Sequence, residues 1–472
     1  MKKISYIICM FAMLVATTSC EDFLNITPDG QSKRDEQLST SEGIEEAMYG
    51  VYSQLRSQTL YGQELYFSTL EMLSHTMWCQ SSDKSTEALS MYDWENSSVK
   101  SVFESIWTSM YKNISNVNSV LDAPLVKEAK NYPYTIYRGE ALGLRAFMHF
   151  DLVRLFAEQY TQNKGAEGIP YATEFSLKTP EFESLEDNYR HIIADLLEAE
   201  SLLVNEDEYE GLGNYMLDRQ IHFNKYAVWG TLARVYLTMG QNEKAYEYAQ
   251  KAVGGKYTLK EKTEIVNDLA GVLSRKECLW GIYSRDFYNS VNTMLQQTIS
   301  FTSLDLRDDF KEKYEAGDYR WSAYFSEVRQ GSSEVKYRLS KFTDMYEKND
   351  IVASRPADLI QGINMIRIPE MYYIISEALL NRKTKNDSVQ ALGYYNAVRE
   401  RRGLPQLEDA ENFNINLISE ERFKEMIGEG QTYFNMKRLN SDIKSYDGKA
   451  NYKASKEIYV VPIPDIEKEY RF

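Results

Sequence analysis

The sequence predicts a mostly α-helical protein that carries a second, loop-rich part. Apolar residues recur at helical spacing over several long segments, and one pair of adjacent segments matches a helical-hairpin repeat. Two long stretches between these segments lack a sustained helical period. A chain of 472 residues has room for one large or two interlocked domains, and its 43% hydrophobic content is typical of a globular protein.

Helical patterns account for most of the predicted scaffold. Residues 137–156 are apolar on nearly every face, which predicts a central buried helix. Its charged residues Arg145, Asp151 and Arg154 then need partners, and we expect structural ion pairs. Further amphipathic helices are expected over residues 44–56, 102–121 and 185–204, with Trp107 and Trp229 in the core.

Residues 224–257 carry the clearest repeat. Gly240 lies between two helical patterns, where a tight turn needs glycine. The apolar positions fall at the spacings of a tetratricopeptide hairpin: Trp229, Leu232, Ala233, Tyr236, Ala245, Ala249 and Ala252. A second, looser hairpin is expected over residues 369–381 and 388–402. Because one hairpin cannot bury its own apolar face, we expect stacked helix pairs.

The remaining stretches predict a different kind of structure. Residues 58–101 and 258–365 are rich in Ser, Asp, Gly and aromatic side chains, so we expect long loops, short strands and short helices there. They would lie over a helical scaffold comprising residues 41–57, 102–257 and 366–440, all within one domain over 41–472. Long loops on a rigid scaffold often carry binding sites. Residues 459–464 (YVVPIP) are expected to be extended because proline disfavours helix.

The N-terminus predicts export and lipid anchoring. Lys2 and Lys3 precede a run of 13 mostly apolar residues, which is too short to span a bilayer but suits a signal peptide over residues 1–19. Small residues lead directly to Cys20, as in a lipoprotein cleavage box, so we expect acylation of Cys20 and a tether over residues 20–40. The alternative is an ordinary secretory signal followed by an incidental cysteine.

The net charge limits the classes of ligand and partner, and the cysteine content limits the possible disulfides. The formal net charge is −16, and removal of residues 1–19, which carry two lysines and no acid, makes it −18. This balance argues against nucleic acid as a partner and favours neutral over anionic ligands, although a local basic pocket can override it. After cleavage and acylation, Cys79 and Cys278 remain, and they would allow one disulfide that a fold of this size does not need.

The sequence lacks the common catalytic and metal-binding motifs. The four histidines share no short spacing, and the sequence contains no HExxH, GxSxG or GxxxxGK pattern. His149 lies on the predicted buried helix and is expected to be a core residue. We therefore expect a binding protein with no cofactor, no metal and no enzymatic activity.

Several ordered strings together resemble the SusD/RagB family of outer-membrane nutrient-binding lipoproteins. They are CEDFL at 20–24, YRGEALGLRAFMHFDLVRLF at 137–156, DLLEAE at 195–200, PEMYYIISEA at 369–378, NAVRERRG at 396–403, EERFKE at 420–425, KRL at 437–439 and VPIP at 461–464. The resemblance implies a tetratricopeptide-type helical half and an irregular ligand-binding half. It also implies cell-surface capture of oligosaccharides, or in some members peptides, and delivery to a SusC-like TonB-dependent transporter in the outer membrane.

Aromatic residues outside the predicted helices are the candidates for a glycan site. Sugar rings pack on Trp and Tyr faces, while their hydroxyls need polar neighbours. Two regions, 66–96 and 280–324, offer such residues, and we expect ligand contacts from Trp78, Trp94, Tyr92, Asn96, Trp280, Tyr283, Arg285, Tyr288, Trp321 and Tyr324. Each ring could instead pack a loop on the scaffold. Capture of peptides or another non-sugar nutrient, and a periplasmic scaffold that binds only protein, stay open as alternatives.

Overall fold

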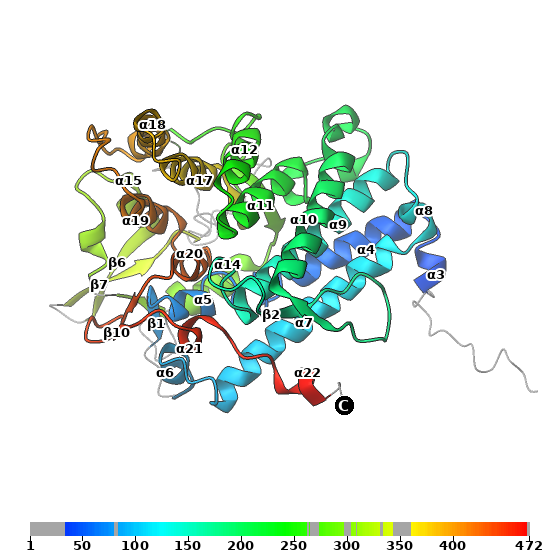
Figure 1. The fold of residues 1–472 in the computed structure, drawn as a ribbon, viewed down its shortest axis with the longest axis horizontal. Helices are drawn as coiled ribbons and strands as arrows, with labels where there is room; N and C mark the ends of the chain where they lie inside the picture. Colours follow the sequence, from blue (N-terminus) through cyan, green and yellow to red (C-terminus); the bar gives the residue numbers. More distant parts are fainter. Residues whose placement is uncertain are drawn as a thin grey trace, which may run out of the picture.

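The computed structural model describes residues 34–79, 84–261, 264, 273–296, 304–307, 309–330, 334–342 and 360–469. The predicted signal peptide, Cys20 and most of the predicted tether lie outside the described residues. Helices dominate the described part, as the sequence predicts (Figure 1). The longest are α4 (Ser41–Leu55), α7 (Ser97–Leu121), α9 (Tyr134–Phe156), α10 (Leu185–Leu203), α11 (Lys225–Thr238), α12 (Asn242–Val253), α17 (Ile368–Leu380), α18 (Lys385–Arg401) and α19 (Ile415–Met426).

Six of these helices form a row of antiparallel hairpins. Helix α9 packs on α10, α10 on α11, α11 on α12, α12 on α17 and α17 on α18. Figure 1 shows α11, α12, α17 and α18 together at the top, with α4, α7, α9 and α10 to their right. Gly240 makes the turn between α11 and α12 at φ +72°, which confirms the predicted hairpin. Both predicted hairpins are present and stack on each other, as the burial of their apolar faces requires.

The helix boundaries follow capping side chains in the sequence. The hydroxyl or amide oxygen of each capping residue accepts a backbone N–H from the first turn, which replaces a missing intrahelical bond. These caps are Thr40 for α4, Asn96 for α7, Ser184 for α10, Asn224 for α11, Thr384 for α18 and Asn414 for α19. Such local signals explain why most predicted helices agree with the observed ones to within a few residues.

Helix α9 is buried along almost its whole length, as predicted. Its charged side chains have the expected ion-pair partners: Arg145 binds Asp195 through two hydrogen bonds of 2.7 Å, and Arg154 binds Asp151. His149 is completely buried and accepts the N–H of Ala172, so it is a core histidine. Because charges inside a core need such partners, these pairs make the central position of α9 possible.

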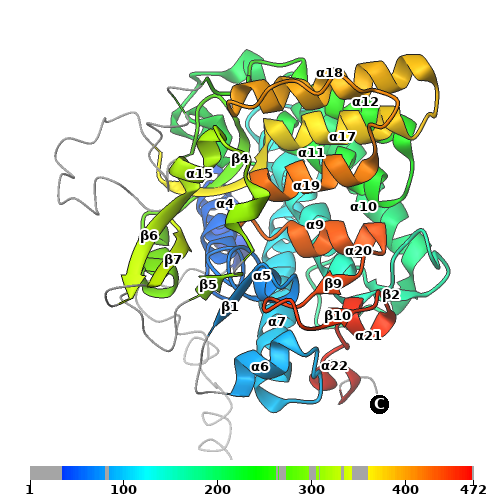
Figure 2. The same ribbon diagram turned by 90° about the vertical axis from the view of Figure 1, so that its left-hand side faces the viewer.

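The strands form two-stranded antiparallel ribbons. They are β1 (Met77–Cys79) with β5 (Leu304–Leu306), β2 (Glu167–Pro170) with β3 (Phe182–Ser184), β4 (Cys278–Tyr283) with β8 (Gly362–Arg367), β6 (Phe325–Gln330) with β7 (Glu334–Leu339), and β9 (Ile443–Lys444) with β10 (Asn451–Tyr452). Figure 2 shows β1, β5, β6 and β7 on one side of the molecule and α17 to α20 on the other.

The short helices accompany these ribbons and the C-terminus. They include α3 (Arg34–Gln37), α5 (Thr69–Leu73), α6 (Lys84–Ser90), α8 (Pro124–Lys127), α14 (Phe287–Val291), α15 (Tyr319–Tyr324), α20 (Thr432–Leu439), α21 (Lys456–Tyr459) and α22 (Asp465–Glu469). The expected extended segment begins after Tyr459, which ends α21, and residues 460–464 have no helix. Cys278 is a buried free thiol in the structure, whereas the side chain of Cys79 lies outside the described residues.

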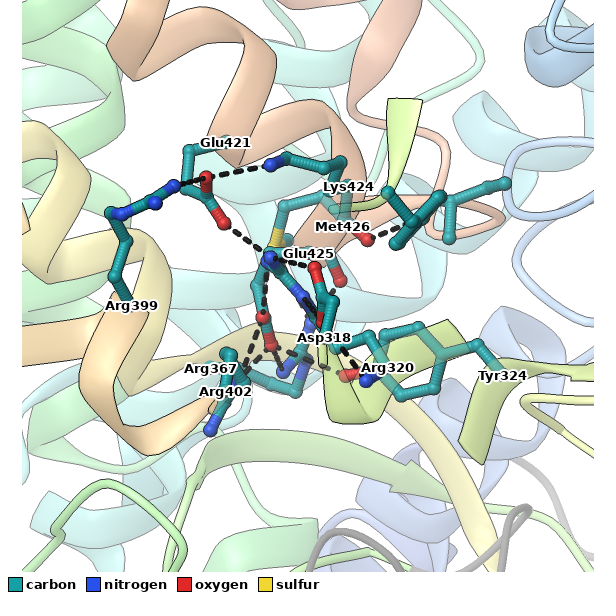
Figure 3. Close-up of polar contacts among 12 residues, drawn as sticks. Asp318, Arg320, Tyr324, Arg367, Arg399, Arg402, Glu421, Lys424, Glu425 and Met426 are labelled. Atoms are coloured by element: carbon teal, nitrogen blue, oxygen red, sulfur yellow. Dashed lines mark hydrogen bonds and ion pairs between the residues drawn. The ribbon is translucent and has the colours of Figure 1, made fainter. Parts of the chain in front are cut away.

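A buried ion network joins the irregular half to the helical half (Figure 3). Glu425 of α19 accepts hydrogen bonds from Arg367 of β8 at 2.8 Å and from Arg402 at the end of α18 at 2.9 Å. Arg320 of α15 approaches the same carboxylate at 3.3 Å and also binds Asp318 at 2.7 Å. The neighbouring guanidinium groups hold the pKa of Glu425 well below its usual range against the opposing effect of burial.

We expect Glu425→Gln to destabilise the protein strongly. The substitution leaves three buried guanidinium groups without their shared carboxylate, and breaking a buried ion pair costs about 3–5 kcal/mol. The midpoint of urea unfolding measures this loss. Glu261→Gln is the matched control, because Glu261 pairs with Arg401 where both side chains are about half exposed, and such surface pairs contribute at most about 1 kcal/mol. Equal midpoints for the two variants would contradict the structural role of the network.

Candidate ligand-binding site

Trp78 and Tyr446 form a flat aromatic pair on the irregular side of the molecule. Their ring centroids lie 4.4 Å apart with an interplanar angle of 7°, and both residues are half-buried. The β1–β5 pairing places Asp305 opposite Trp78. Stacked rings next to a carboxylate supply both an apolar face and hydrogen-bond acceptors, which are the groups that a sugar ring needs. We call Trp78 and Tyr446 the aromatic platform.

The β9–β10 hairpin brings Tyr446 to Trp78. The backbone N–H of Tyr446 donates to His75 Nδ1 at 3.3 Å, and the ring of Tyr452 stacks on the His75 ring at 5.1 Å. Burial lowers the pKa of His75 to about 4, so the imidazole is neutral at pH 7 and Nδ1 can accept this hydrogen bond. A neutral His75 therefore holds the second ring of the platform in place.

A cavity of about 490 Å³ is lined mainly by residues of α19 and α20. The rest of its wall comprises Ser74, Arg307, Glu312, Lys313, Glu315 and Gln431. The N–H of Arg307 donates to the carbonyl of Thr76 at 3.4 Å, so this wall continues directly from the ribbon that carries Trp78. The volume lies within the range of small-ligand sites, which span about 300–1,000 Å³.

Comparisons with known proteins decide the family. A family model described as starch-binding associating with outer membrane matches residues 22–237, and the model of the SusD family matches residues 233–467. The chain belongs to the SusD family. No curated protein matched the chain in a sequence search.

Solved structures of SusD-family proteins share the fold. A SusD superfamily protein from Bacteroides thetaiotaomicron is 23% identical with a TM-score of 0.75, covering 93% of this chain and 98% of that one. A SusD-like carbohydrate binding protein from Bacteroides vulgatus is 19% identical with a TM-score of 0.73, covering 90% and 95%. The surface glycan-binding protein A from Bacteroides uniformis is 17% identical with a TM-score of 0.70, covering 92% and 99%.

Trp321 belongs to a second aromatic cluster of this SusD-family protein. It is half-buried in α15, and its ring stacks on Phe325 at 4.8 Å and meets the edge of Tyr337 at 4.8 Å. The cluster continues through Phe310, which contacts Phe325 at 5.6 Å and Phe423 at 5.3 Å, and Phe423 lines the cavity. Trp321 is thus connected to the cavity through packed rings.

Four other residues that were predicted to contact ligand also lie in the irregular half. Tyr324 is half-buried and donates from its hydroxyl to Glu425 at 3.3 Å, so this hydroxyl serves the ion network. Tyr283 and Arg285 are exposed and Tyr288 is half-buried, on β4 and the α14 segment that follows. Ligand binding by these four residues stays a prediction.

Two of the predicted contact residues are buried. Trp280 has no exposed surface and packs on Phe147 at 4.9 Å and Phe223 at 4.7 Å, because β4 is buried between the scaffold and the loops. Tyr92 is also buried and donates from its hydroxyl to the carbonyl of Leu73 at 2.7 Å. The prediction that these two residues contact ligand is wrong.

Asn96 and Trp94 are half-buried and have structural roles, and their contact with ligand stays a prediction. Asn96 caps α7 by accepting the N–H groups of Ser98 and Val99. Trp94 donates from Nε1 to the carbonyl of Glu457 at 2.6 Å and packs edge-on against Phe103. Asn96 therefore stabilises the start of α7, and Trp94 connects this region to the C-terminal segment. The sequence analysis missed Tyr446, since a single tyrosine after the helical part carries no pattern that marks it.

No group of three or more His, Cys, Asp and Glu side chains among the described residues is placed to hold a metal ion. Within the same residues, no helix has the length and apolar character needed to cross a bilayer.

The neutral His75 predicts a pH dependence of stability. Its pKa is about 4 in the fold and about 6.5 in an unfolded chain. Between these values the unfolded chain binds more protons, so the free energy of unfolding decreases as the pH falls from about 6.5 towards 4. We expect His75→Asn, which keeps an acceptor but does not titrate, to lose less stability than the wild type between about pH 7 and about pH 5. Identical losses in urea unfolding would contradict the assignment.

Proposed function

We propose that this SusD-family protein captures oligosaccharides at the cell surface and that the aromatic platform is its primary contact. The observation that carries the proposal is the half-buried Trp78–Tyr446 pair, whose rings are parallel and stacked, on a ribbon that leads to the wall of a cavity of about 490 Å³. Its geometry suits stacking against a sugar ring. The family description and the glycan-binding proteins that share this fold support the ligand class.

The captured glycan would pass to a partner transporter. The resemblance to SusD/RagB lipoproteins supports a SusC-like TonB-dependent barrel as that partner and an outer-membrane anchor through acylated Cys20. A lipid at Cys20 would hold the folded part at the membrane surface, where the transporter lies. The role is binding and delivery, with no catalytic step assigned to any residue.

Affinity gels containing single polysaccharides test the proposal with the mature protein. We expect retardation by at least one glycan, and we expect Trp78→Ala and Tyr446→Ala each to weaken that binding about tenfold or more. Stacking on one aromatic ring contributes roughly 0.5–1.5 kcal/mol beyond the buried area, so removal of a ring removes both contributions. Trp78→Phe keeps a flat ring and should retain most of the affinity.

Phe175→Ala is the control for these variants, since Phe175 is 45% exposed on the helical side of the molecule. It should bind like the wild type. Full affinity in both platform variants, with unchanged folding by circular dichroism, would refute the platform. Binding of peptides with no glycan retained would favour the non-sugar alternative for the same architecture.

A further inference from the structure

The cavity lined by α19 and α20 has both acidic and basic residues in its wall, and several of these neutralise one another. Lys424 lies 2.8 Å from Glu421, and Arg422 lies 2.6 Å from Glu370. Glu315 accepts a 2.8 Å hydrogen bond from Arg399. Each of these charged side chains has an oppositely charged partner within the protein. They therefore do not determine which ligand the cavity prefers.

Two further cations of the wall, Arg307 and Lys313, are less fully paired among the described residues. The Arg307 side chain is only 9% exposed, and its Nε donates to Asp309, while its two terminal nitrogens bind no described residue. Lys313 is half-buried and makes no hydrogen bond or ion pair with the described part of the chain; its nearest aromatic ring is Phe423, at 5.7 Å. Among the described residues, the carboxylates of Asp309 and Glu420 lie near Lys313, and Lys444 also approaches Asp309 at 3.8 Å.

The proximity of the two cations has an electrostatic consequence. Burial lowers the pKa of Lys313, and the positive charge of Arg307 lowers it further. Glu312 and Glu420 also line the cavity, but both are exposed, so water screens their charges. Arg307 and Lys313 thus place two positive charges at the cavity, and the exposed carboxylates of the wall offset them only weakly.

We propose that this cavity binds a carboxylate carried by a sugar ring, with Arg307 and Lys313 as its ligands, so that the captured glycan contains acidic sugar units. A carboxylate would bring negative charge and acceptor oxygens to these two cations. The inference deepens the proposed function and rests on it for the sugar part of the ligand. It departs from the neutral ligand that the net charge favours, because a local basic pocket overrides the charge of the whole chain.

Three monosaccharides that differ in charge but share a pyranose ring test the proposal by isothermal titration of the mature protein. Glucuronate is anionic, glucose is neutral and glucosamine is cationic. We expect glucuronate to bind at least tenfold more tightly than glucose, and its affinity to fall with added salt. Equal affinity for glucuronate and glucose, tighter binding of glucosamine, or no binding of glucuronate up to tens of millimolar would each overturn the carboxylate site.

Variants locate the effect in the cavity. Lys313→Met removes a charge with no partner in the described structure, so it should fold normally and bind glucuronate several-fold more weakly. Arg307→Met should do the same, with circular dichroism as a check on folding. Lys130→Met is the control, because Lys130 is exposed on the helical scaffold, and it should bind glucuronate like the wild type. Unchanged glucuronate affinity in the Lys313 and Arg307 variants would place the binding elsewhere and refute the assignment.

The two proposals fail separately. Retention of a neutral polysaccharide through the aromatic platform, with no preference for glucuronate, would leave the proposed function intact and remove the carboxylate site. Binding of glucuronate that depends on Lys313, with no polysaccharide retained, would keep the carboxylate site and remove the glycan-capture function.

Discussion

The arrangement of the helical half and the irregular half depends on the ion pairs that the carboxylate of Glu425 makes. Glu425 lies in α19, has no exposed surface and receives guanidinium groups from β8, the end of α18 and α15. Ions buried in this way are costly unless each has a partner, so the segments that supply them are confined to one relative position. The same network fixes residues 318–324, which continue from the cavity wall. The position of the cavity wall therefore depends on the ion network around Glu425.

The stacked helical hairpins provide a rigid scaffold, and the candidate binding residues lie mostly outside them. Stacked hairpins from α9 to α18 bury a continuous core, and their helices begin at capping residues that the sequence supplies. The aromatic platform lies on short ribbons attached to that core, and the cavity lies between α19, α20 and the irregular segment that holds Arg307 and Lys313. Short strands alone have little stability, which explains why buried polar contacts, such as the one between His75 and Tyr446, secure them. Binding groups on a rigid support can be pre-organised without many residues of their own.

The helical half could be predicted because its information is local: the apolar period, Gly240 and the capping residues lie within a few positions of the helices that they define. The candidate site was predicted only in part. Trp78 is half-buried whereas Trp280 is in the core, and no local pattern separates these two tryptophans. Tyr446 and Arg307 depend on contacts with residues far away in the sequence, Trp78 and Thr76, which only the fold reveals. The resemblance to SusD/RagB proteins predicted the family but not the ligand.

The most direct test of the account is a crystal structure of the mature protein with a polysaccharide fragment that its affinity gels retain. The account predicts a sugar ring against the faces of Trp78 or Tyr446, with the chain of sugars running towards the cavity that Arg307 and Lys313 line. A fragment bound on the helical hairpins or at the C-terminal segment, with the platform empty, would contradict it.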